Sequence, residues 1–365
     1  MIPKKIQTWQ MTQPWSEEGS HVIPGRIEQT EIDVPPVQSG DVLVEIAGCG
    51  VCHTDLGFFY DGVPTIQKAP LTLGHEISGR VIAGDSELFG REVIIPSVMP
   101  CNNCPICAQD RGNRCLHQKM PGNSMGIYGG YSSHIVVPEA DLCVVKDRDS
   151  MPLEYLAVIA DAISTPYQAT VRADIKPGDR TIVIGAGGGV GNYVMQLCRA
   201  LGAEAVIAID IVEDKLELAL KFGATHTINA KGKTEKDVKA DYKAICKQNG
   251  WPSHYDWKIF EVSGTKCGQA IGLELLSFVS KLILIGFGCS THDIMISRLM
   301  ALDAEVIGTW ACPPKYYPKV LDMVLTKQIE IKPFVETRPM STVKEVFEEI
   351  HHTAPTRRVV LTPDF

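Results

Sequence analysis

The distribution of apolar residues divides the chain into regions of different pattern. Residues 1 to about 160 contain short apolar runs separated by turns rich in glycine and proline, for example at 41–46 and 91–95. Strands of this length predict an irregular, mostly β domain. Residues from about 162 to 311 instead alternate apolar strands with segments of helical spacing, which is typical of parallel βαβα structure.

The alternating region predicts a doubly wound parallel sheet. It starts with a strand at 181–184, a glycine-rich turn and a helix at 192–201, and a strand at 205–209 and a helix at 213–222 repeat this order. The remaining expected elements are strands at 258–262, 281–286 and 358–362 and helices at 318–327 and 341–351. The predicted fold class is therefore α/β, and we expect the last fifty residues to pack back onto the first region.

The composition indicates a globular protein and narrows its partners. The 365 residues suffice for two domains, and the content of 45% hydrophobic and 21% charged residues is not that of a disordered chain. The formal net charge of −8 argues against a nucleic-acid partner. The N-terminus lacks the apolar run of a signal peptide, and no apolar run reaches the roughly 18 residues of a membrane span. We therefore expect a cytoplasmic protein with no membrane partner.

Four of the twelve cysteines form a cluster with the spacing C-x2-C-x2-C-x7-C. They are Cys101, Cys104, Cys107 and Cys115. Four thiolates within fifteen residues predict one tetrahedral Zn²⁺, and such a closed site has a structural role because no position stays open for substrate. Pro100 and Pro105 predict that this segment is a loop. An iron–sulfur cluster and a set of free thiols are the alternatives.

A glycine-rich loop at 185–191 follows the first strand of the alternating region and precedes a helix. Its spacing is G-x-x-G-G-x-G, with glycines at Gly185, Gly188, Gly189 and Gly191. Glycines let a backbone turn tightly and approach a pyrophosphate at a helix N-terminus. Asp210 ends the next strand, where a carboxylate accepts the ribose hydroxyls of NAD and repels the 2′-phosphate of NADP. Lys215 lies within reach of the same ribose. A tight turn and a helix N-cap are the simpler alternatives for the loop and for Asp210.

Cys52 and His75 are the residue types that bind catalytic zinc. A catalytic zinc has three protein ligands and one open position, so a third ligand must come from elsewhere in the chain. Each residue alone has an ordinary alternative, a buried thiol for Cys52 and a hydrogen-bonded core residue for His75.

These motifs occur together in an order that resembles one family. Cys52-His-Thr-Asp55, then Gly74-His-Glu76, then the four cysteines, then the glycine loop with Asp210 are similar to the zinc-containing medium-chain alcohol dehydrogenases over essentially the whole chain. The resemblance implies a GroES-like catalytic domain formed by residues 1–161 and 312–365. It also implies an inserted NAD-binding Rossmann domain at 162–311, with the active site in the cleft between the two.

The resemblance implies two zinc ions and assigns the catalytic residues. Cys52 and His75 are two ligands of the catalytic zinc. The third is Asp161, which stands where relatives carry a cysteine, and Glu76 is the alternative ligand or an outer group that exchanges with water. The hydroxyl of Thr54 links the substrate oxygen to the cofactor ribose. Many relatives end this proton relay with a histidine at the position of Gly57, so the relay beyond Thr54 differs here.

The resemblance also assigns contacts to the NAD cofactor. His53 lies near the pyrophosphate, and Arg358 in the final strand meets the same group. Val190, Thr165 and the backbone near Ile285 match positions that contact the nicotinamide.

Two segments carry a closer resemblance. Residues 47–64 and 73–80 resemble 6-hydroxycyclohex-1-ene-1-carbonyl-CoA dehydrogenases. This implies that an alicyclic acyl-CoA is the substrate, whose ring hydroxyl is oxidised to a ketone with NAD in anaerobic benzoyl-CoA degradation. Slow conjugate reduction of the resulting enone is a further expectation. Val98 and Gly57, which are small where relatives are bulky, are compatible with a ring in the site. Relatives are dimers or tetramers, so we expect a homodimer or homotetramer.

Three other functions compete with this interpretation. A general zinc alcohol or polyol dehydrogenase would act on free alcohols equally well. A protein that binds zinc and NAD without turnover would act as a sensor, although the set of Cys52, His75 and Thr54 argues against it. A thiol-rich nucleic-acid binder conflicts with the acidic charge and with the glycine loop.

Overall fold

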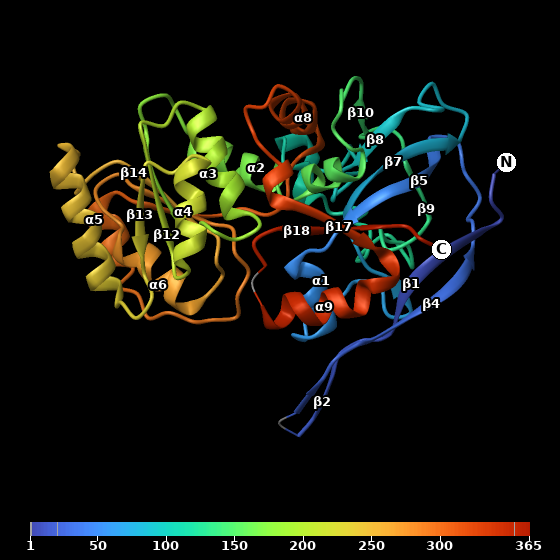
Figure 1. Cartoon of the computed structure of the whole chain (residues 1–365), viewed down its shortest axis with the longest axis horizontal. Coiled ribbons are helices and arrows are strands. Elements are labelled where there is room, and N and C mark those ends of the chain that lie inside the picture. Colours follow the sequence, from blue (N-terminus) through green and yellow to red (C-terminus); the bar gives the residue numbers. More distant parts are fainter. Residues whose placement is uncertain (1, 20, 354) are drawn as a thin grey trace. The chain divides into compact units, whose positions relative to one another are not determined.

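The chain folds into two compact units, and each is described separately. The computed structural model describes residues 2–19, 21–353 and 355–365. Unit 1 comprises Met1–Ser164, Ala311–Leu325 and Ile331–Phe365, and unit 2 comprises Thr165–Trp310 and Thr326–Glu330. Figure 1 shows unit 1 mainly in blue, cyan and red, and unit 2 in yellow-green to orange.

Unit 1 is built around the long strand β5 (Asp41–Gly50). Its main sheet has the order β10-β8-β7-β5-β18-β17, and β9 also pairs with β5. The other strands of this sheet are β7 (Glu76–Ala83), β8 (Glu92–Ile95), β9 (His134–Pro138), β10 (Cys143–Val145), β17 (Val335–Pro339) and β18 (Arg358–Thr362). Because β18 pairs with β5, the last residues of the chain pack on the first region, as the sequence pattern predicts.

Unit 1 also contains a second sheet, a hairpin and several helices. A second sheet has the order β4-β1-β6, and β2 and β3 form a hairpin. These strands are β1 (Lys5–Gln13), β2 (Ser16–Glu18), β3 (His21–Ile23), β4 (Arg26–Asp33) and β6 (Leu71–Thr72). The α-helices are α1 (His53–Phe59), α8 (Tyr317–Leu325) and α9 (Val343–His352). The 3-10 helices are η1 (Cys107–Gln109), η2 (Gly112–Arg114), η3 (Glu154–Ala160), η4 (Pro314–Tyr316), η5 (Lys332–Phe334) and η6 (Met340–Thr342).

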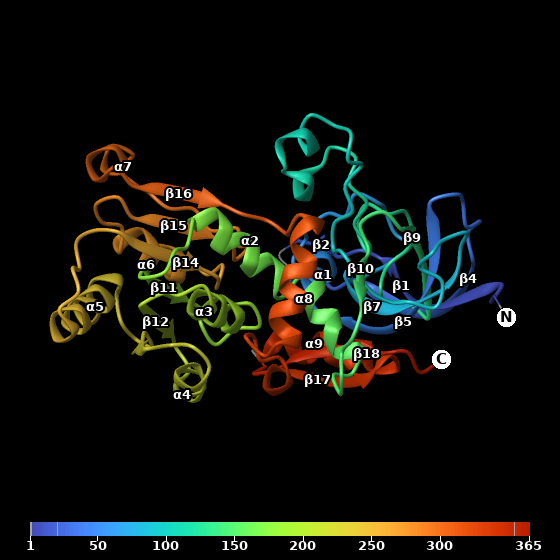
Figure 2. The ribbon, with the colours of Figure 1, turned by 90° about the horizontal axis from the view of Figure 1, so that it is seen from above.

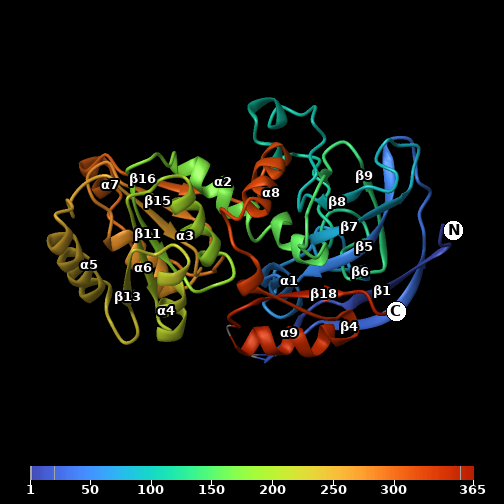
Figure 3. The same ribbon diagram turned by 45° about the horizontal axis from the view of Figure 1, so that its top comes forward.

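Helix α9 closes one side of the core of unit 1. Its residues Val343, Val346, Phe347 and Ile350 recur at helical spacing and are buried. They join the same apolar cluster as Leu56 of α1, and Figure 3 shows the two helices side by side. This packing holds α1, which follows directly after Cys52, against the core.

Unit 2 is a doubly wound parallel sheet, as the alternating pattern predicts. Its order is β13-β12-β11-β14-β15-β16, and all pairs are parallel. The strands are β11 (Arg180–Ile184), β12 (Ala205–Asp210), β13 (His226–Asn229), β14 (Trp257–Glu261), β15 (Lys281–Leu284) and β16 (Glu305–Gly308). The helices are α2 (Ser164–Ala173), which begins at the last residue of the first segment of unit 1, α3 (Gly191–Ala200), α4 (Glu213–Lys221), α5 (Glu235–Asn249), α6 (Lys266–Glu274) and α7 (Ser297–Leu302).

Successive residues of these buried strands face opposite sides of the sheet. Ile182 and Ile184 pack in a cluster with residues of α5 and α6. Val183 packs in a second cluster with residues of α2, α3 and α4. Figure 2 shows the sheet of unit 2 between these two helix layers. Strand order reverses between β11 and β14, so the crevice for a ligand is expected at the carboxyl ends of these two strands.

The expected elements of the alternating region and of the C-terminus are present, with ends that shift by one or two residues. The predictions omit the helices α2, α5, α6 and α7 and the strands β13 and β16. In α5 only three residues, Val238, Tyr242 and Cys246, are buried, and most of the others are polar. The expectation that the four-cysteine segment is only loop is wrong, because η1 and η2 form two helical turns between its third and fourth cysteines. In the described part of the chain, no helix is long and apolar enough to span a membrane.

The segment Thr326–Glu330 differs from the expected boundaries, which place it with residues 312–365. The side chain of Gln196 in α3 binds the backbone of Glu330 twice. Its Nε2 donates to the Glu330 carbonyl at 3.2 Å, and its Oε1 accepts from the Glu330 N–H at 2.7 Å. These two bonds attach the segment to unit 2.

Candidate functional site

Antiparallel pairing places Cys52 near His75 in unit 1. Cys52 follows the end of β5, and His75 directly precedes β7. The two strands pair with Gly50 opposite Glu76, so the end of β5 lies beside the start of β7. Both candidate ligands are buried, with 7% of Cys52 and 2% of His75 exposed.

Asp161 joins this pair from a distant part of the sequence. It follows η3 directly, and its Oδ2 lies 3.8 Å from Cys52 Sγ and 3.9 Å from His75 Nε2. Together with Glu76, these residues offer one sulfur, one nitrogen and two carboxylate oxygens that all lie within 4.8 Å of one another. Thiolate, imidazole and carboxylate at this separation are the donors that zinc binds, so the residues present fit a zinc ion.

Asp55 holds Cys52 and His75 in place. Its Oδ1 lies 3.4 Å from His75 Nδ1, and its Oδ2 accepts from the backbone N–H of Cys52 at 3.1 Å and from the Tyr131 hydroxyl at 2.8 Å. Asp55 is fully buried, and burial disfavours its charge. His75, Tyr131 and Cys52 outweigh that effect and hold the pKa of Asp55 below its usual value. A charged Asp55 leaves the other ring nitrogen of His75, Nε2, to face the donor set.

The carboxylate of Glu76 is paired with an arginine. Arg358 Nε donates to Glu76 Oε2 at 3.1 Å, and Arg358 Nη2 pairs with Glu76 Oε1. Burial raises the pKa of Glu76, and Arg358 opposes this rise. The geometry therefore favours Asp161 over Glu76 as the third ligand.

Arg358, for which the sequence predicts a pyrophosphate contact, pairs with Glu76, and the pyrophosphate contact stays a prediction. Its side chain is 7% exposed and ion-pairs with Glu76 inside unit 1. His53, the other predicted pyrophosphate contact, is the first residue of α1 and is exposed. Thr54 is partly exposed, and its Oγ1 lies 3.6 Å from Cys52 Sγ, beside the donor set.

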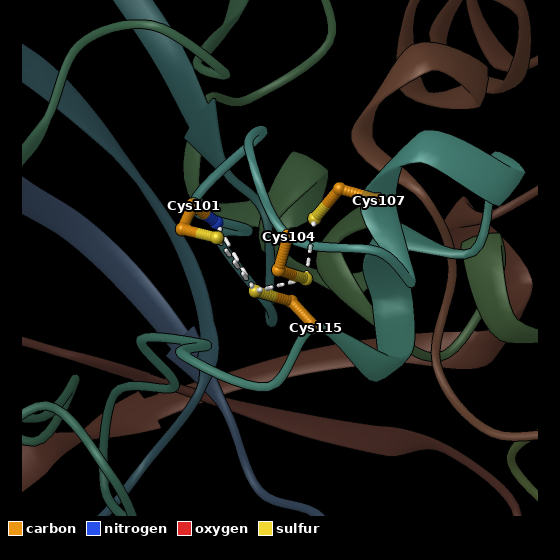
Figure 4. Close-up of side chains that lie close together, drawn as sticks. All are labelled: Cys101, Cys104, Cys107 and Cys115. Carbon is orange, nitrogen blue, oxygen red and sulfur yellow. Dashed lines mark hydrogen bonds between the residues drawn. The ribbon is translucent and has the colours of Figure 1, made fainter.

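The four clustered cysteines converge on one point. Figure 4 shows their sulfur atoms facing one another, with Cys107 extending from a helical turn. The Sγ distances are 3.5 Å for Cys104–Cys107, 3.8 Å for Cys104–Cys115 and 3.4 Å for Cys101–Cys115. Two thiolates bound at about 2.3 Å to one tetrahedral zinc are about 3.8 Å apart, so these distances fit that ion.

Backbone groups prepare this cluster for a cation. The N–H groups of Cys101 and His117 each lie 3.2 Å from Cys115 Sγ. Backbone N–H groups of Leu116 and Cys107 lower the pKa of the Cys104 thiol to about 6, whereas burial raises that of Cys107 to about 12. A bound cation is what allows four adjacent thiols to ionise together.

The glycine loop of unit 2 joins β11 to α3. Gly187 N–H donates to Asp210 Oδ2 at 2.8 Å, which ties the loop to the end of β12. A side chain at Gly187 would meet Lys215 Cβ at 2.5 Å, and one at Gly191 would collide with the carbonyl oxygen of Gly185. The loop therefore keeps this shape only with glycine at these positions.

Asp210 and Lys215 play different parts around this loop. Oδ1 of Asp210 accepts from the N–H groups of Ile211 and Val212, at 2.8 and 3.2 Å, so the carboxylate is fixed in orientation. Lys215 is only 6% exposed, and its aliphatic chain packs on Gly187. Burial lowers the pKa of Lys215, and the charge of Asp210 opposes that effect.

The other predicted cofactor contacts lie at the carboxyl end of the sheet or near its helices. Val190 is the N-cap of α3, and Thr165 is a buried residue in the first turn of α2. Ile285 directly follows β15, and its N–H donates to the carbonyl of Glu261 at 2.9 Å. Val98, the predicted pocket residue of unit 1, is fully buried.

Sequence reasoning misses three residues that organise these sites, namely Asp55, Tyr131 and Glu261. The sequence signal for Asp55 is its position three residues after Cys52, a spacing that fits the first turn of a helix. Glu261 is an acidic residue within an apolar strand, which is also a visible signal. Nothing local in the sequence connects Tyr131 with Asp55, because 76 residues separate them.

The chain is similar to known alcohol dehydrogenases over most of its length. The alcohol dehydrogenase GroES-like domain matches residues 38–147, and the zinc-binding dehydrogenase domain matches residues 189–326. An alcohol dehydrogenase of Geobacillus stearothermophilus is 29% identical, with 92% of this chain and 95% of the relative covered. An NAD-dependent alcohol dehydrogenase of Sulfolobus acidocaldarius is 28% identical, with 86% and 88% covered. The crystal structure of galactitol-1-phosphate dehydrogenase from Escherichia coli is 25% identical, with a TM-score of 0.82 and with 98% and 100% covered.

The chain belongs to the zinc-type medium-chain alcohol dehydrogenase family. The α/β fold with a GroES-like part and a Rossmann-type parallel sheet is thereby confirmed. The protein is a zinc-dependent alcohol dehydrogenase, and zinc and a nicotinamide dinucleotide are its cofactors.

Proposed function

We propose that the protein oxidises a secondary alcohol with NAD at the site formed by Cys52, His75 and Asp161. The observation that carries this proposal is the buried set of four donor atoms within 4.8 Å of one another. When bound, zinc supplies Lewis-acid polarisation of an alcohol oxygen, and the nicotinamide supplies a hydride acceptor. The four-cysteine cluster holds the second, structural zinc.

The protein residues of this site have different roles. Asp55 orients His75, and Asp161 supplies an oxygen donor. Thr54, whose hydroxyl lies beside Cys52, accepts the proton of the substrate hydroxyl at Oγ1 and passes it outward. Glu76 stays paired with Arg358 and contributes negative charge near the ligands rather than a permanent bond.

The cofactor preference is assigned to Asp210. Its carboxylate is fixed at the end of β12 by three backbone N–H groups, at the position where a dinucleotide ribose is recognised. A fixed negative charge there accepts two ribose hydroxyls and repels a 2′-phosphate. We therefore assign NAD rather than NADP.

The substrate proposal is the ring alcohol of 6-hydroxycyclohex-1-ene-1-carbonyl-CoA, which the enzyme converts to the 6-oxo thioester in anaerobic benzoyl-CoA degradation. It is supported by the resemblance of residues 47–64 and 73–80. Steady-state kinetics with NAD test it, with this thioester compared with free cyclohex-2-enol. A kcat/KM at least about a hundredfold higher for the thioester supports the proposal. Equal values contradict it and favour a general alcohol or polyol dehydrogenase.

The general alternative has its own support. One solved relative is named as a dehydrogenase of galactitol 1-phosphate, an open-chain polyol phosphate. A panel of free polyols, polyol phosphates and cyclic alcohols therefore belongs in the same experiment. Conjugate reduction is tested by incubating the enone thioester with NADH, and formation of the alcohol alone counts against it.

We also propose that the protein forms homodimers or homotetramers in the cytoplasm. Strand β16 is an open edge of the sheet of unit 2, and the segment before it exposes Met295, Ile296 and Met300 by 68 to 77%. Open edges and large apolar patches are typical of interfaces. Light scattering of the wild type and of M295K/M300K tests this surface, and an unchanged mass contradicts it.

The cytoplasmic assignment is supported by the four-thiol cluster, because metal-binding thiols must stay reduced.

A further inference from the structure

Glu261 is a buried acid that the proposed chemistry does not use. It is the last residue of β14 and is fully buried. In the described part of the chain, no lysine, arginine or histidine forms an ion pair with it. Burial raises the pKa of Glu261, and hydrogen bonds from Ser263 and Gly264 oppose that rise. A buried carboxylate without a cation is unfavourable, so its presence calls for a physical reason.

The carboxylate closes the turn that follows β14. Its Oε1 accepts from the Ser263 N–H at 2.9 Å, from the Gly264 N–H at 3.2 Å and from the Ser263 hydroxyl. Its Oε2 accepts from the Gly264 N–H at 3.2 Å. All of these donors are neutral, so the negative charge of Glu261 is solvated by the turn but is not cancelled.

The backbone of Glu261 holds the adjacent segment. Its carbonyl accepts from the N–H groups of Ile285 and Gly286, at 2.9 and 3.1 Å. Gly264 adopts a φ of +64°, and any side chain at Gly264, Gly286 or Gly288 would collide with the facing backbone. The turns after β14 and β15 therefore form one closely packed unit with Glu261 at its centre.

This unit lies at the point where strand order reverses. Glu261 pairs in register with Ile184, the last residue of β11, and a side chain at Gly185 would lie 2.9 Å from Ser263. The turn of Glu261 therefore adjoins the glycine loop. In doubly wound folds a dinucleotide binds across the carboxyl ends of the strands at such a reversal. If the cofactor binds as proposed above, the nicotinamide end extends past β14 and β15.

We propose that Glu261 is a charged positioning residue that favours the oxidised cofactor. The nicotinamide ring of NAD⁺ carries a positive charge, and that of NADH carries none. An uncancelled carboxylate beneath the nicotinamide-binding turn attracts NAD⁺ and has no such effect on NADH. It also fixes the segment that contains Ile285. This inference rests on the proposed function, because it requires that a nicotinamide dinucleotide binds unit 2.

The test uses the variant Glu261→Gln in the full-length, zinc-loaded enzyme. Glutamine keeps the shape and the Oε1 acceptor but removes the charge. The dissociation constants of NAD⁺ and NADH are measured separately, by calorimetry and by cofactor fluorescence. We expect the ratio Kd(NAD⁺)/Kd(NADH) to rise about fivefold, the effect that Coulomb's law gives for two unit charges about 17 Å apart at an effective dielectric constant of about 20.

The control variant is Ser263→Ala, which removes one donor of the turn and keeps the charge. It should weaken both cofactors by similar factors and leave their ratio unchanged. Thermal unfolding of both variants verifies that they fold. If E261Q instead weakens NAD⁺ and NADH equally, the role of Glu261 is only structural and the proposal is overturned.

Failure of the proposed function and failure of the role of Glu261 give different results. If the wild type binds neither NAD⁺ nor NADH, the proposed function itself is wrong. If the wild type binds both and E261Q leaves their ratio unchanged, the proposed function stands and only the role of Glu261 falls.

Discussion

The carboxylate of Glu76 and the guanidinium of Arg358 form a buried ion pair across 282 residues of sequence. Glu76 is the first residue of β7, and Arg358 is the first residue of β18. Gly50, in the strand between them, has no side chain, and any Cβ there would collide with the Glu76 carboxylate. The pair therefore passes over the end of β5 and joins the C-terminal strand to the proposed zinc ligands.

Removing Arg358 should destabilise unit 1 strongly. Arg358→Met leaves Glu76 as an uncompensated buried charge, and we expect a loss of about 3–5 kcal/mol in the free energy of unfolding. The double variant E76Q/R358M removes both charges and should recover most of that loss. Urea unfolding followed by fluorescence measures both. If the double variant is no more stable than R358M, the uncompensated charge of Glu76 is not the cause of the lost stability.

Asp161 and Glu76 should differ in their effect on metal content. The Asp161 carboxylate reaches both Cys52 and His75, whereas that of Glu76 is held by Arg358. We expect Asp161→Ala to lose about one zinc per chain, and Glu76→Gln to retain it. Mass spectrometry of dialysed protein measures the content. If E76Q loses the zinc and D161A retains it, Glu76 and not Asp161 is the third ligand.

The sequence predicts parts of these sites to different extents, for physical reasons. The four cysteines lie within one short segment, so their spacing alone indicates their common ligand. The strand, glycine loop and Asp210 follow one another in a local βαβ unit, so their order is also visible. Asp161 and Cys52 are 109 residues apart and meet only through the packing of η3 on the sheet. The pairing of Glu76 with Arg358 depends on β18 joining β5, which no local pattern determines.

Loss of one clustered cysteine should remove the structural metal alone. Cys107→Ser leaves three thiolates around the site, and we expect the zinc content to fall from about two ions per chain toward one. The stability should fall by about 2 kcal/mol or more, because metal binding contributes to folding. Cys267→Ser, which changes an exposed thiol, is the matched control and should change neither value. Unchanged zinc content in C107S would rule out the closed four-thiolate site.

Asp210 should determine the choice between NAD and NADP. In Asp210→Asn the fixed negative charge at the end of β12 is absent, so a 2′-phosphate is no longer repelled. We expect the ratio of kcat/KM for NAD to that for NADP to fall by about tenfold or more. Asp214→Asn neutralises an exposed acid in the first turn of α4 and should leave the ratio unchanged. An equal fall in both variants would mean that general surface charge sets the preference.

Glu92 should give unit 1 a stability that depends on pH. Its carboxylate binds Arg148 twice, at 2.7 and 3.1 Å, and Arg80 once, at 2.7 Å. Its side chain is 16% exposed, so solvent screens these contacts only partly. The hydrogen bonds and charge of Arg148, with the charge of Arg80, hold the pKa of Glu92 below its usual value.

The direction of the effect follows from this lowered pKa. A carboxylate whose pKa is lower in the folded state binds its proton more readily when unfolded, so it stabilises the fold above the unfolded pKa of about 4.3. That stabilisation disappears as the pH falls through the folded value. Glu92→Gln should therefore lose about 1–2 kcal/mol at pH 7 and match the wild type in strong acid. Urea midpoints measured across this pH range test the prediction, with the exposed Glu87→Gln as control. If E92Q is less stable than the wild type by the same amount at every pH, lost packing and not charge is responsible.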